Sequence, residues 1–233
     1  MSYVILNGTT LEEGVIREII SHVNKLYSDK VDVRKLKFIE IVDSLENNSS
    51  GRTVRDKIFL PRIHDLETLE CTEDIWNEES VNIKRLISTI YHELWHVTTW
   101  NKYKDMYEYV LDENNDDITA LAFNYWIEYV AHMETVFMEE TDTMKDFCQE
   151  FVKIKWHRME YGYQRFIKAA SYFIVRSRYL ENFDELVSTI QFDKLRKVII
   201  ELDEISKSLY NKNMKEHEKA MIVKEIINGL YKK

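Results

Sequence analysis

Glycine and proline are scarce in this chain of 233 residues, which contains 5 Gly and 1 Pro. Turn-rich sandwiches and barrels, and folds that bind nucleotides on Gly-rich loops, need many more of both residues. Hydrophobic residues make up 45% of the sequence and charged residues 31%, so the chain can bury a sizeable core and is neither disordered nor fibrous. The composition therefore predicts a globular protein that is mostly helical.

Cysteine and long apolar runs are also rare. Cys71 and Cys148 are far apart and fit no CxxC or CxxH spacing, which argues against a disulfide scaffold and against a thiolate zinc site. No uncharged apolar run approaches the roughly 20 residues that span a bilayer, and the first residues resemble no secretion signal. We therefore expect a cytoplasmic protein that does not bind a membrane.

Positively charged residues are also fewer than negatively charged ones. The chain has 32 Lys and Arg against 41 Asp and Glu, a formal net charge of -9. A negative charge works against the release of counterions, which supplies most of the affinity of proteins for nucleic acids. We expect no nucleic-acid partner.

A short strand and an amphipathic helix are predicted at the start of the chain. Residues 3–6 are apolar and precede a turn signal, and Thr9 with Glu12 offers a capping box for a helix. The apolar residues that follow recur at helical spacing: Val15, Ile16, Ile19, Ile20, Val23 and Leu26.

Two further strands are predicted at residues 35–43 (KLKFIEIVD) and 53–61 (TVRDKIFLP). The first is rich in β-branched and aromatic residues, and the second alternates apolar and polar side chains. Because Pro61 cannot donate a hydrogen bond and residues 55–57 are charged, we expect the second strand to lie at the edge of a small sheet.

The period of apolar residues becomes helical beyond residue 77 and stays helical. Helices are predicted at roughly residues 80–103, 115–140, 143–180, 193–210 and 213–230. No Pro-rich or Gly-rich linker separates them, so the chain is either one domain or that domain with a helical C-terminal extension.

The sequence HELWH at residues 92–96, within the first of these helices, is an HExxH motif. Residues four apart lie on one face of a helix, so His92 and His96 can both point a ring nitrogen at one zinc ion, while Glu93 projects beside them as a general base. The opposite stripe of the helix is apolar, as expected of a core-facing surface. It consists of Ile83, Leu86, Ile87, Ile90, Leu94 and Val97.

A histidine pair also occurs on ordinary helices. A catalytic zinc has three protein ligands and one open position, so a third ligand is needed. The candidates downstream are Asp117, Glu128 and His132. Glu128 lies in the middle of a strongly apolar helix, where a carboxylate without a cation would be costly to bury. We therefore favour Glu128 as the third ligand, with His132 as the alternative.

An HExxH helix followed about thirty residues later by Glu-x-x-Ala, here residues 128–131, resembles the gluzincin metallopeptidases. The resemblance is greatest to their small cytoplasmic bacterial and phage branch, the ImmA/IrrE-type and minigluzincin proteins, and covers roughly residues 33–140. The chain departs from that family at two positions. His132 stands where the family often has an Asp, and Trp95 stands where it commonly has a small residue.

The resemblance implies a zinc-dependent metalloendopeptidase of α+β fold, predominantly helical. A small N-terminal mixed sheet would pack on the HExxH helix and on the helix of the ligand glutamate, forming a core of residues 1–140. A helical part, residues 141–233, would follow and pack on the same core. His92, His96 and Glu128 would bind Zn²⁺, Glu93 would be the general base, and the strand at 54–60 would align an extended peptide or protein substrate.

Other functions remain possible on the residues alone. Residues 93–96 are also Glu-x-x-His, which di-iron bundles use twice, but no second copy occurs. A nucleophilic hydrolase lacks its Gly-x-Ser-x-Gly elbow, and neither cysteine has a catalytic signature. The remaining alternative is an inactive or non-enzymatic helical protein that binds a partner through residues 195–210 and 217–231.

Overall fold

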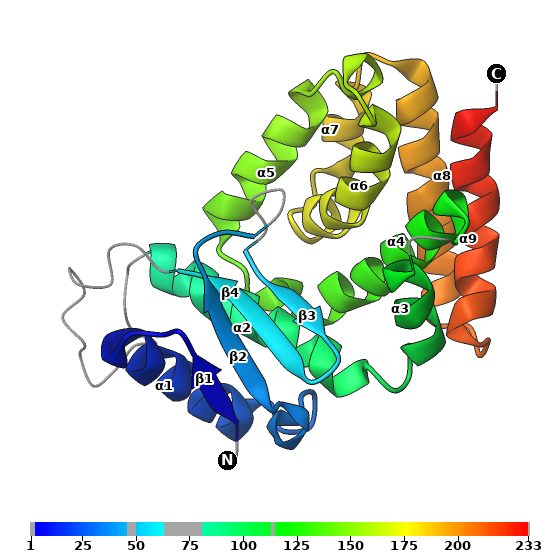
Figure 1. Ribbon diagram of the computed structural model, residues 1–233. Coiled ribbons are helices and arrows are strands. Elements are labelled where there is room, and N and C mark those ends of the chain that lie inside the picture. The colour runs from blue at the N-terminus through cyan, green and yellow to red at the C-terminus, as the bar shows by residue number, and fades with distance from the viewer. Residues whose placement is uncertain (1–2, 46–49, 63–80, 113–114, 233) are drawn as a thin grey trace. The chain divides into compact units, whose positions relative to one another are not determined.

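The computed structural model describes residues 3–45, 50–62, 81–112 and 115–232 (Figure 1). It confirms an α+β fold that is predominantly helical, with a small mixed sheet near the N-terminus. The chain forms two compact units, Met1–Lys102 with Phe137–Glu140, and Tyr103–Val136 with Thr141–Lys233. The chain passes from one unit to the other after residues 102, 136 and 140. The HExxH helix and the glutamate helix therefore belong to different units.

The first unit contains the sheet and the HExxH helix (Figure 1). Its elements are β1 (Val4–Leu6), α1 (Thr10–Leu26), the short 3₁₀ helix η1 (Val33–Lys35), β2 (Phe38–Val42), β3 (Arg52–Val54), β4 (Lys57–Pro61) and α2 (Val81–Thr99). The strand order is β1-β2-β4-β3. β1, β2 and β4 run parallel, and β3 runs antiparallel to β4.

The predicted edge strand at residues 53–61 is wrong in two respects. Residues 52–61 form a hairpin of two strands, β3 and β4, that turns at Arg55 and Asp56, with Arg55 at a positive φ of 58°. β4 pairs with β2 on one side and β3 on the other, so β3 takes the edge. Pro61 is the last residue of β4, and the pairing with β3 ends earlier, where Arg52 lies opposite Phe59. The missing N–H of Pro61 therefore costs no hydrogen bond to β3.

The helix α1 begins as the sequence predicts. The Thr9 N–H donates to Glu12 Oε2 at 2.8 Å, and the Glu12 N–H donates to Thr9 Oγ1 at 3.2 Å, which completes the capping box. Arg62, just after β4, forms an ion pair with the same Glu12 at 3.1 Å. The start of α1 is thereby tied to the end of β4. The buried face of α1 consists of Val15, Ile16, Ile19, Ile20 and Val23.

The second unit is helical among its described residues (Figure 1). Its elements are α3 (Lys104–Leu111), α4 (Asp117–Thr135), α5 (Thr141–Lys153), η6 (Trp156–Arg158), α6 (Gly162–Tyr179), α7 (Phe183–Ser188), α8 (Asp193–Tyr210) and α9 (Glu216–Tyr231); a further 3₁₀ turn, η5 (Val136–Met138), begins where the second unit gives way to residues of the first. Within this unit α4 packs against α6 and α9, and α8 packs against α9.

The single helix predicted at residues 143–180 is wrong, because the chain breaks it into α5, η6 and α6. Trp156 turns inward after α5 and is buried, and its Nε1–H donates to the carbonyl of Phe151 at 3.0 Å. Tyr161 then takes a left-handed conformation at φ 53°. A Cβ on Gly162 would lie 1.7 Å from the Trp156 carbonyl oxygen, so this close approach of two backbone segments requires glycine.

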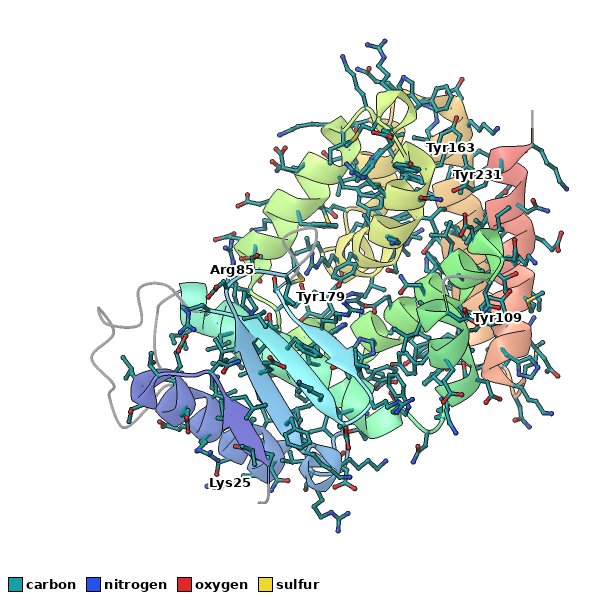
Figure 2. All side chains as sticks on the ribbon, viewed as in Figure 1. Lys25, Arg85, Tyr109, Tyr163, Tyr179 and Tyr231 are labelled. Carbon is teal, nitrogen blue, oxygen red and sulfur yellow. The ribbon has the colours of Figure 1, made fainter. Side chains whose placement is uncertain are left out.

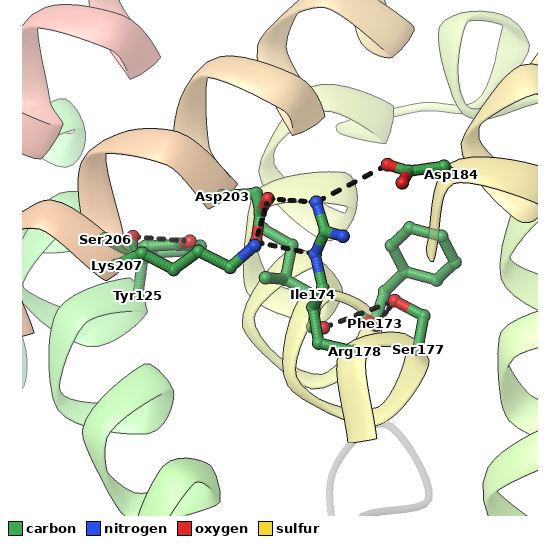
Figure 3. Close-up of polar contacts among 9 residues, drawn as sticks. All are labelled: Tyr125, Phe173, Ile174, Ser177, Arg178, Asp184, Asp203, Ser206 and Lys207. Atoms are coloured by element: carbon green, nitrogen blue, oxygen red, sulfur yellow. Dashed lines mark hydrogen bonds and ion pairs between the residues drawn. The ribbon is translucent and has the colours of Figure 1, made fainter. Parts of the chain in front are cut away.

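A buried carboxylate joins α6 to α8 in the second unit. Figure 3 shows Asp203 of α8 between Arg178 of α6, at 2.6 Å, and Lys207, at 3.0 Å. Beside it the hydroxyls of Tyr125 on α4 and Ser206 on α8 are 3.1 Å apart. Asp203 is 1% exposed, and its ion pair with Arg178 joins α8 to α6.

Two properties predicted from the composition concern the described residues. No described helix combines the length and the apolar character needed to cross a bilayer. Cys148 is buried and is not part of a disulfide, and Cys71 lies outside the described residues.

Candidate metal centre

The helix α2 is held on three sides within the first unit. It packs against β3 and β4, which present the buried side chains Ile58 and Leu60. The ring of Tyr91 lies 5.1 Å from that of Tyr27, at the end of α1, and 5.7 Å from that of Phe137. A helix fixed in this way presents the HExxH side chains in one direction.

The segment around η1 fixes the C-terminal end of α2. The backbone N–H of Asp32 donates to Thr98 Oγ1 at 2.8 Å, and Lys35 Nζ donates to the Thr98 carbonyl oxygen at 2.6 Å. A lysine in this position stabilises a helix end, because it satisfies a carbonyl that has no partner within the helix and opposes the negative end of the helix dipole.

The two histidines of the motif converge on one point. His92 Nε2 and His96 Nε2 are 2.9 Å apart, and the rings meet nearly at right angles, at 78°. Two imidazole nitrogens bound to one tetrahedral zinc at 2.0–2.1 Å would lie about 3.4 Å apart. The observed separation is close to that value, so the pair needs only a small adjustment to share an ion. His96 is buried and His92 is half-buried.

Glu93, the predicted base, is buried and contacts the edge strand of the sheet. Its Oε2 accepts a hydrogen bond from the Thr53 hydroxyl of β3 at 2.7 Å, and the same hydroxyl lies 3.1 Å from the Glu93 carbonyl oxygen. Gly51 also lies close, because a Cβ there would be 2.8 Å from Glu93 Oε1. Sequence reasoning missed both residues.

The third-ligand candidates of the sequence lie on α4, in the second unit. Glu128 and His132 share one face of this helix, with His132 Nε2 at 3.7 Å from Glu128 Oε2. His132 is 2% exposed, and its ring centroid lies 3.7 Å from that of Tyr172 on α6. Asp117 is the first residue of α4, about three turns from Glu128, so it does not share their position on the helix.

The start of α4 is capped by a carboxylate. Asp116 accepts a hydrogen bond from the Thr119 N–H at 3.0 Å and one from the Thr119 hydroxyl, and Lys224 Nζ lies 3.1 Å away. The hydrogen bonds from Thr119, and after them the contact with Lys224, lower the pKa of Asp116 to about 2. The cap is therefore ionised and formed at neutral pH.

Asp116→Ala should lower the free energy of unfolding by about 1 kcal/mol at pH 7, because it removes the cap of α4. The folded-state pKa lies below the unfolded value, so the stabilisation is present above pH 4 and declines as the pH falls from about 4 towards 2. Urea unfolding at several pH values measures the difference. Asp146→Ala, which removes an exposed carboxylate within α5, is the control and should show no such dependence. A pH-independent effect of Asp116→Ala would contradict the capping role.

Three residues of the second unit, His157, Tyr161 and Tyr163, have side chains of the types that stabilise an oxyanion in zinc peptidases. His157 stacks on Phe192, with ring centroids 4.5 Å apart, and Tyr161 is 64% exposed. Tyr163 meets Tyr231 edge to face at 5.9 Å (Figure 2). Neither of these ring contacts involves Glu128 or His132.

In the first unit α2 carries two imidazoles and a carboxylate, and in the second unit α4 carries one of each. These are side-chain types that zinc hydrolases use as ligands and as a base. The signal for His92, Glu93 and His96 is their spacing in sequence. Thr53 and Gly51 carry no comparable signal, because their contact with Glu93 spans about 40 residues. Comparisons with protein-family models, with curated proteins and with solved structures find no match to the chain.

Proposed function

We propose that this protein is a zinc-dependent metallopeptidase that hydrolyses peptide bonds. The observation that carries the proposal is the HExxH helix itself: His92 and His96 bring their Nε2 atoms to 2.9 Å, and the carboxylate between them is held by the adjacent edge strand. At 2.9 Å the two nitrogens are also within hydrogen-bonding distance of each other, so a measurement of bound metal separates a ligand pair from a hydrogen-bonded pair.

His92, His96 and Glu128 would bind the zinc in this proposal, which leaves a fourth position for water or substrate. Two imidazoles and one carboxylate are a set that catalytic zinc sites use. The bound ion would supply a water of lowered pKa and polarise the carbonyl to be cleaved. Glu93 would accept the proton of the attacking water and pass it to the leaving amine. His132, at 3.7 Å from Glu128, would orient that carboxylate.

The edge strand β3 is the proposed binding surface for an extended peptide. The outer edge of a sheet offers backbone N–H and C=O groups to an added strand, and side-chain pockets then supply specificity. The resemblance to the gluzincins implies this role for residues 54–60. Because β4 is paired on both sides, the proposal moves it to Arg52–Val54. The substrate would be a peptide or protein, with no nucleic acid or membrane involved.

The test of the proposal is cleavage that depends on metal. The protein is incubated with a peptide library and, because the resembling family often cleaves them, with helix-turn-helix regulator proteins. Products should form, disappear after treatment with a chelator, and return when stoichiometric zinc is added. Cleavage that survives complete removal of metal would refute the mechanism, and no cleavage of any substrate would refute the peptidase.

Replacing the proposed third ligand should have a larger effect on metal than replacing its neighbour. Glu128→Ala should lose zinc readily, whereas His132→Ala should weaken metal retention or activity by roughly 10- to 100-fold, as expected for a residue that orients a ligand. Zinc retention against a competing chelator measures both. The reverse order would make His132 the ligand, and unfolding curves of the two variants control for loss of structure.

A second candidate function is that of a helical protein without enzymatic activity that binds a partner. Its support is the apolar surface of α9, where Met221 is 39% exposed and Ile222 is 36% exposed. Absence of zinc and of cleavage, together with binding lost on Met221→Ser and Ile222→Ser, would favour this function.

A further inference from the structure

One row of side chains crosses the sheet of the first unit and ends in a polar residue. The register aligns Ile5 of β1 with Ile39 of β2, Ile39 with Ile58 of β4, and Ile58 with Thr53 of β3. Directly paired residues point to the same face of a sheet. The three isoleucines are 6%, 0% and 0% exposed, in that order. A fourth β-branched apolar residue would fit the pattern, and the chain has threonine there.

The hydroxyl that distinguishes Thr53 from valine points at Glu93. It is 2.7 Å from Oε2 and 3.1 Å from the carbonyl oxygen of the same residue. A hydroxyl has one hydrogen, which the geometry directs to the nearer acceptor, the carboxylate oxygen. The contact therefore holds one carboxylate oxygen of Glu93 against the edge strand.

Gly51, the residue just before β3, lies close to the Glu93 side chain on another side. A Cβ on Gly51 would lie 2.8 Å from Glu93 Oε1, 2.9 Å from Glu93 Cγ and 2.8 Å from Thr89 Cγ2. Gly51 has no positive φ, so its backbone would accept alanine without strain. What glycine supplies at this position is space for the carboxylate.

We infer that residues 51–53 position the general base: Thr53 holds Oε2 of Glu93, and Gly51 leaves the space that Oε1 occupies. The inference rests on the proposed function, in which Glu93 is the base and β3 binds the peptide. The strand that binds the substrate would then also fix the group that accepts the proton. A displacement of the base by about 1 Å can lower the rate by about 100-fold. A contact that holds the base in place can therefore raise the rate.

Thermal unfolding of the metal-free protein tests the contact without relying on activity. The variants are Thr53→Val, which is nearly isosteric, Glu93→Met, which removes the carboxylate acceptor and leaves the backbone carbonyl, and the double substitution. A hydrogen bond to a carboxylate should appear as a non-additive Tm shift of about 3 °C. Additive shifts in this cycle would overturn the inference, whatever the activity of the protein.

Steady-state kinetics of the zinc-loaded protein test the positioning role. Thr53→Val should lower kcat about 10-fold on a peptide that the wild type cleaves, with KM and zinc content unchanged. Thr53→Ser, which keeps the hydroxyl, should restore kcat, and Gly51→Ala should lower it while zinc remains bound. Thr98→Val is the matched control, because Thr98 is on α2 and its hydroxyl accepts a bond from Asp32, away from Glu93.

The outcomes separate this inference from the proposed function. Full kcat in Thr53→Val, with an active wild type, would overturn the positioning role and leave the peptidase intact. Failure of Thr53→Ser to restore kcat would also overturn it, because the hydroxyl would then not be the cause. A wild type that neither binds zinc nor cleaves peptides would refute the proposed function, and the role of Glu93 as a base with it.

Discussion

Replacing both motif histidines, as His92→Ala with His96→Ala, should leave the purified protein without zinc, whereas the wild type should carry about one equivalent. Two of the three proposed protein ligands are lost, and the single remaining carboxylate cannot retain the ion against a chelator. Because a metal bound only by the folded state stabilises that state, the variant should also unfold at the temperature of the metal-free wild type. Metal analysis after dialysis and a thermal scan measure the two effects.

A second pair of histidines serves as the control. His157 and His217 are exposed and lie outside the motif, so His157→Ala with His217→Ala should keep the full equivalent of zinc. Equal zinc in the wild type and in the motif variant would end the metal hypothesis. Loss of zinc in both variants would indicate adventitious binding to surface histidines.

Glu93→Gln should keep zinc and fold normally but lose most of its turnover. The amide is nearly isosteric with the carboxylate and can still accept the hydrogen bond from Thr53, so the structure around it is preserved. It cannot accept a proton from water, and general acid–base groups contribute roughly 10²- to 10⁴-fold to rate. The expected loss is therefore in kcat, measured on any peptide that the wild type cleaves.

A glutamate elsewhere on the helix surface of the protein provides the comparison for this variant. Glu225→Gln, on an exposed position of α9, makes the same chemical change and should leave kcat unaffected. Unchanged cleavage in Glu93→Gln with zinc retained would refute Glu93 as the base. Loss of zinc in that variant would instead indicate that Glu93 binds the metal.

The elements predicted best from sequence are those that local signals define. The capping box of Thr9 and Glu12 starts α1 as expected, and the apolar stripe of the HExxH helix, from Ile83 to Val97, is buried throughout. Both patterns depend on residues three or four apart, which a helix brings together without help from the rest of the fold. The motif on α2 was visible for the same reason.

The elements predicted poorly depend on contacts that are distant in sequence. The turn between β3 and β4 consists of Arg55 and Asp56 and contains neither glycine nor asparagine, the residues typical of a two-residue hairpin turn. The sequence pattern therefore predicts one strand where the structure has two. The break between α5 and α6 depends on the close approach of the Gly162 backbone to the Trp156 carbonyl oxygen. The spacing of apolar residues along the sequence gives no sign of such a backbone contact. On α9 the buried apolar positions are Ala220, Val223, Ile227 and Leu230, whereas Met221 is 39% exposed.

The residues of the candidate site also fall into two groups, those with a local signal in the sequence and those without one. Spacing alone identified His92, Glu93 and His96, and the cost of burying a carboxylate singled out Glu128. The hydroxyl of Thr53 and the missing side chain of Gly51 become meaningful only when the sheet register places them beside Glu93. The same holds for Tyr172, which is 40 positions from His132 yet in ring contact with it.

The coordination of zinc in the purified wild type is the most direct test of the central claim, and X-ray absorption at the zinc edge measures it. The proposed site predicts about one equivalent of zinc surrounded by nitrogen and oxygen at about 2.0–2.2 Å, with two imidazoles in the shell and no sulfur. A sulfur shell at about 2.3 Å, a single imidazole, or a protein that binds no zinc would contradict it.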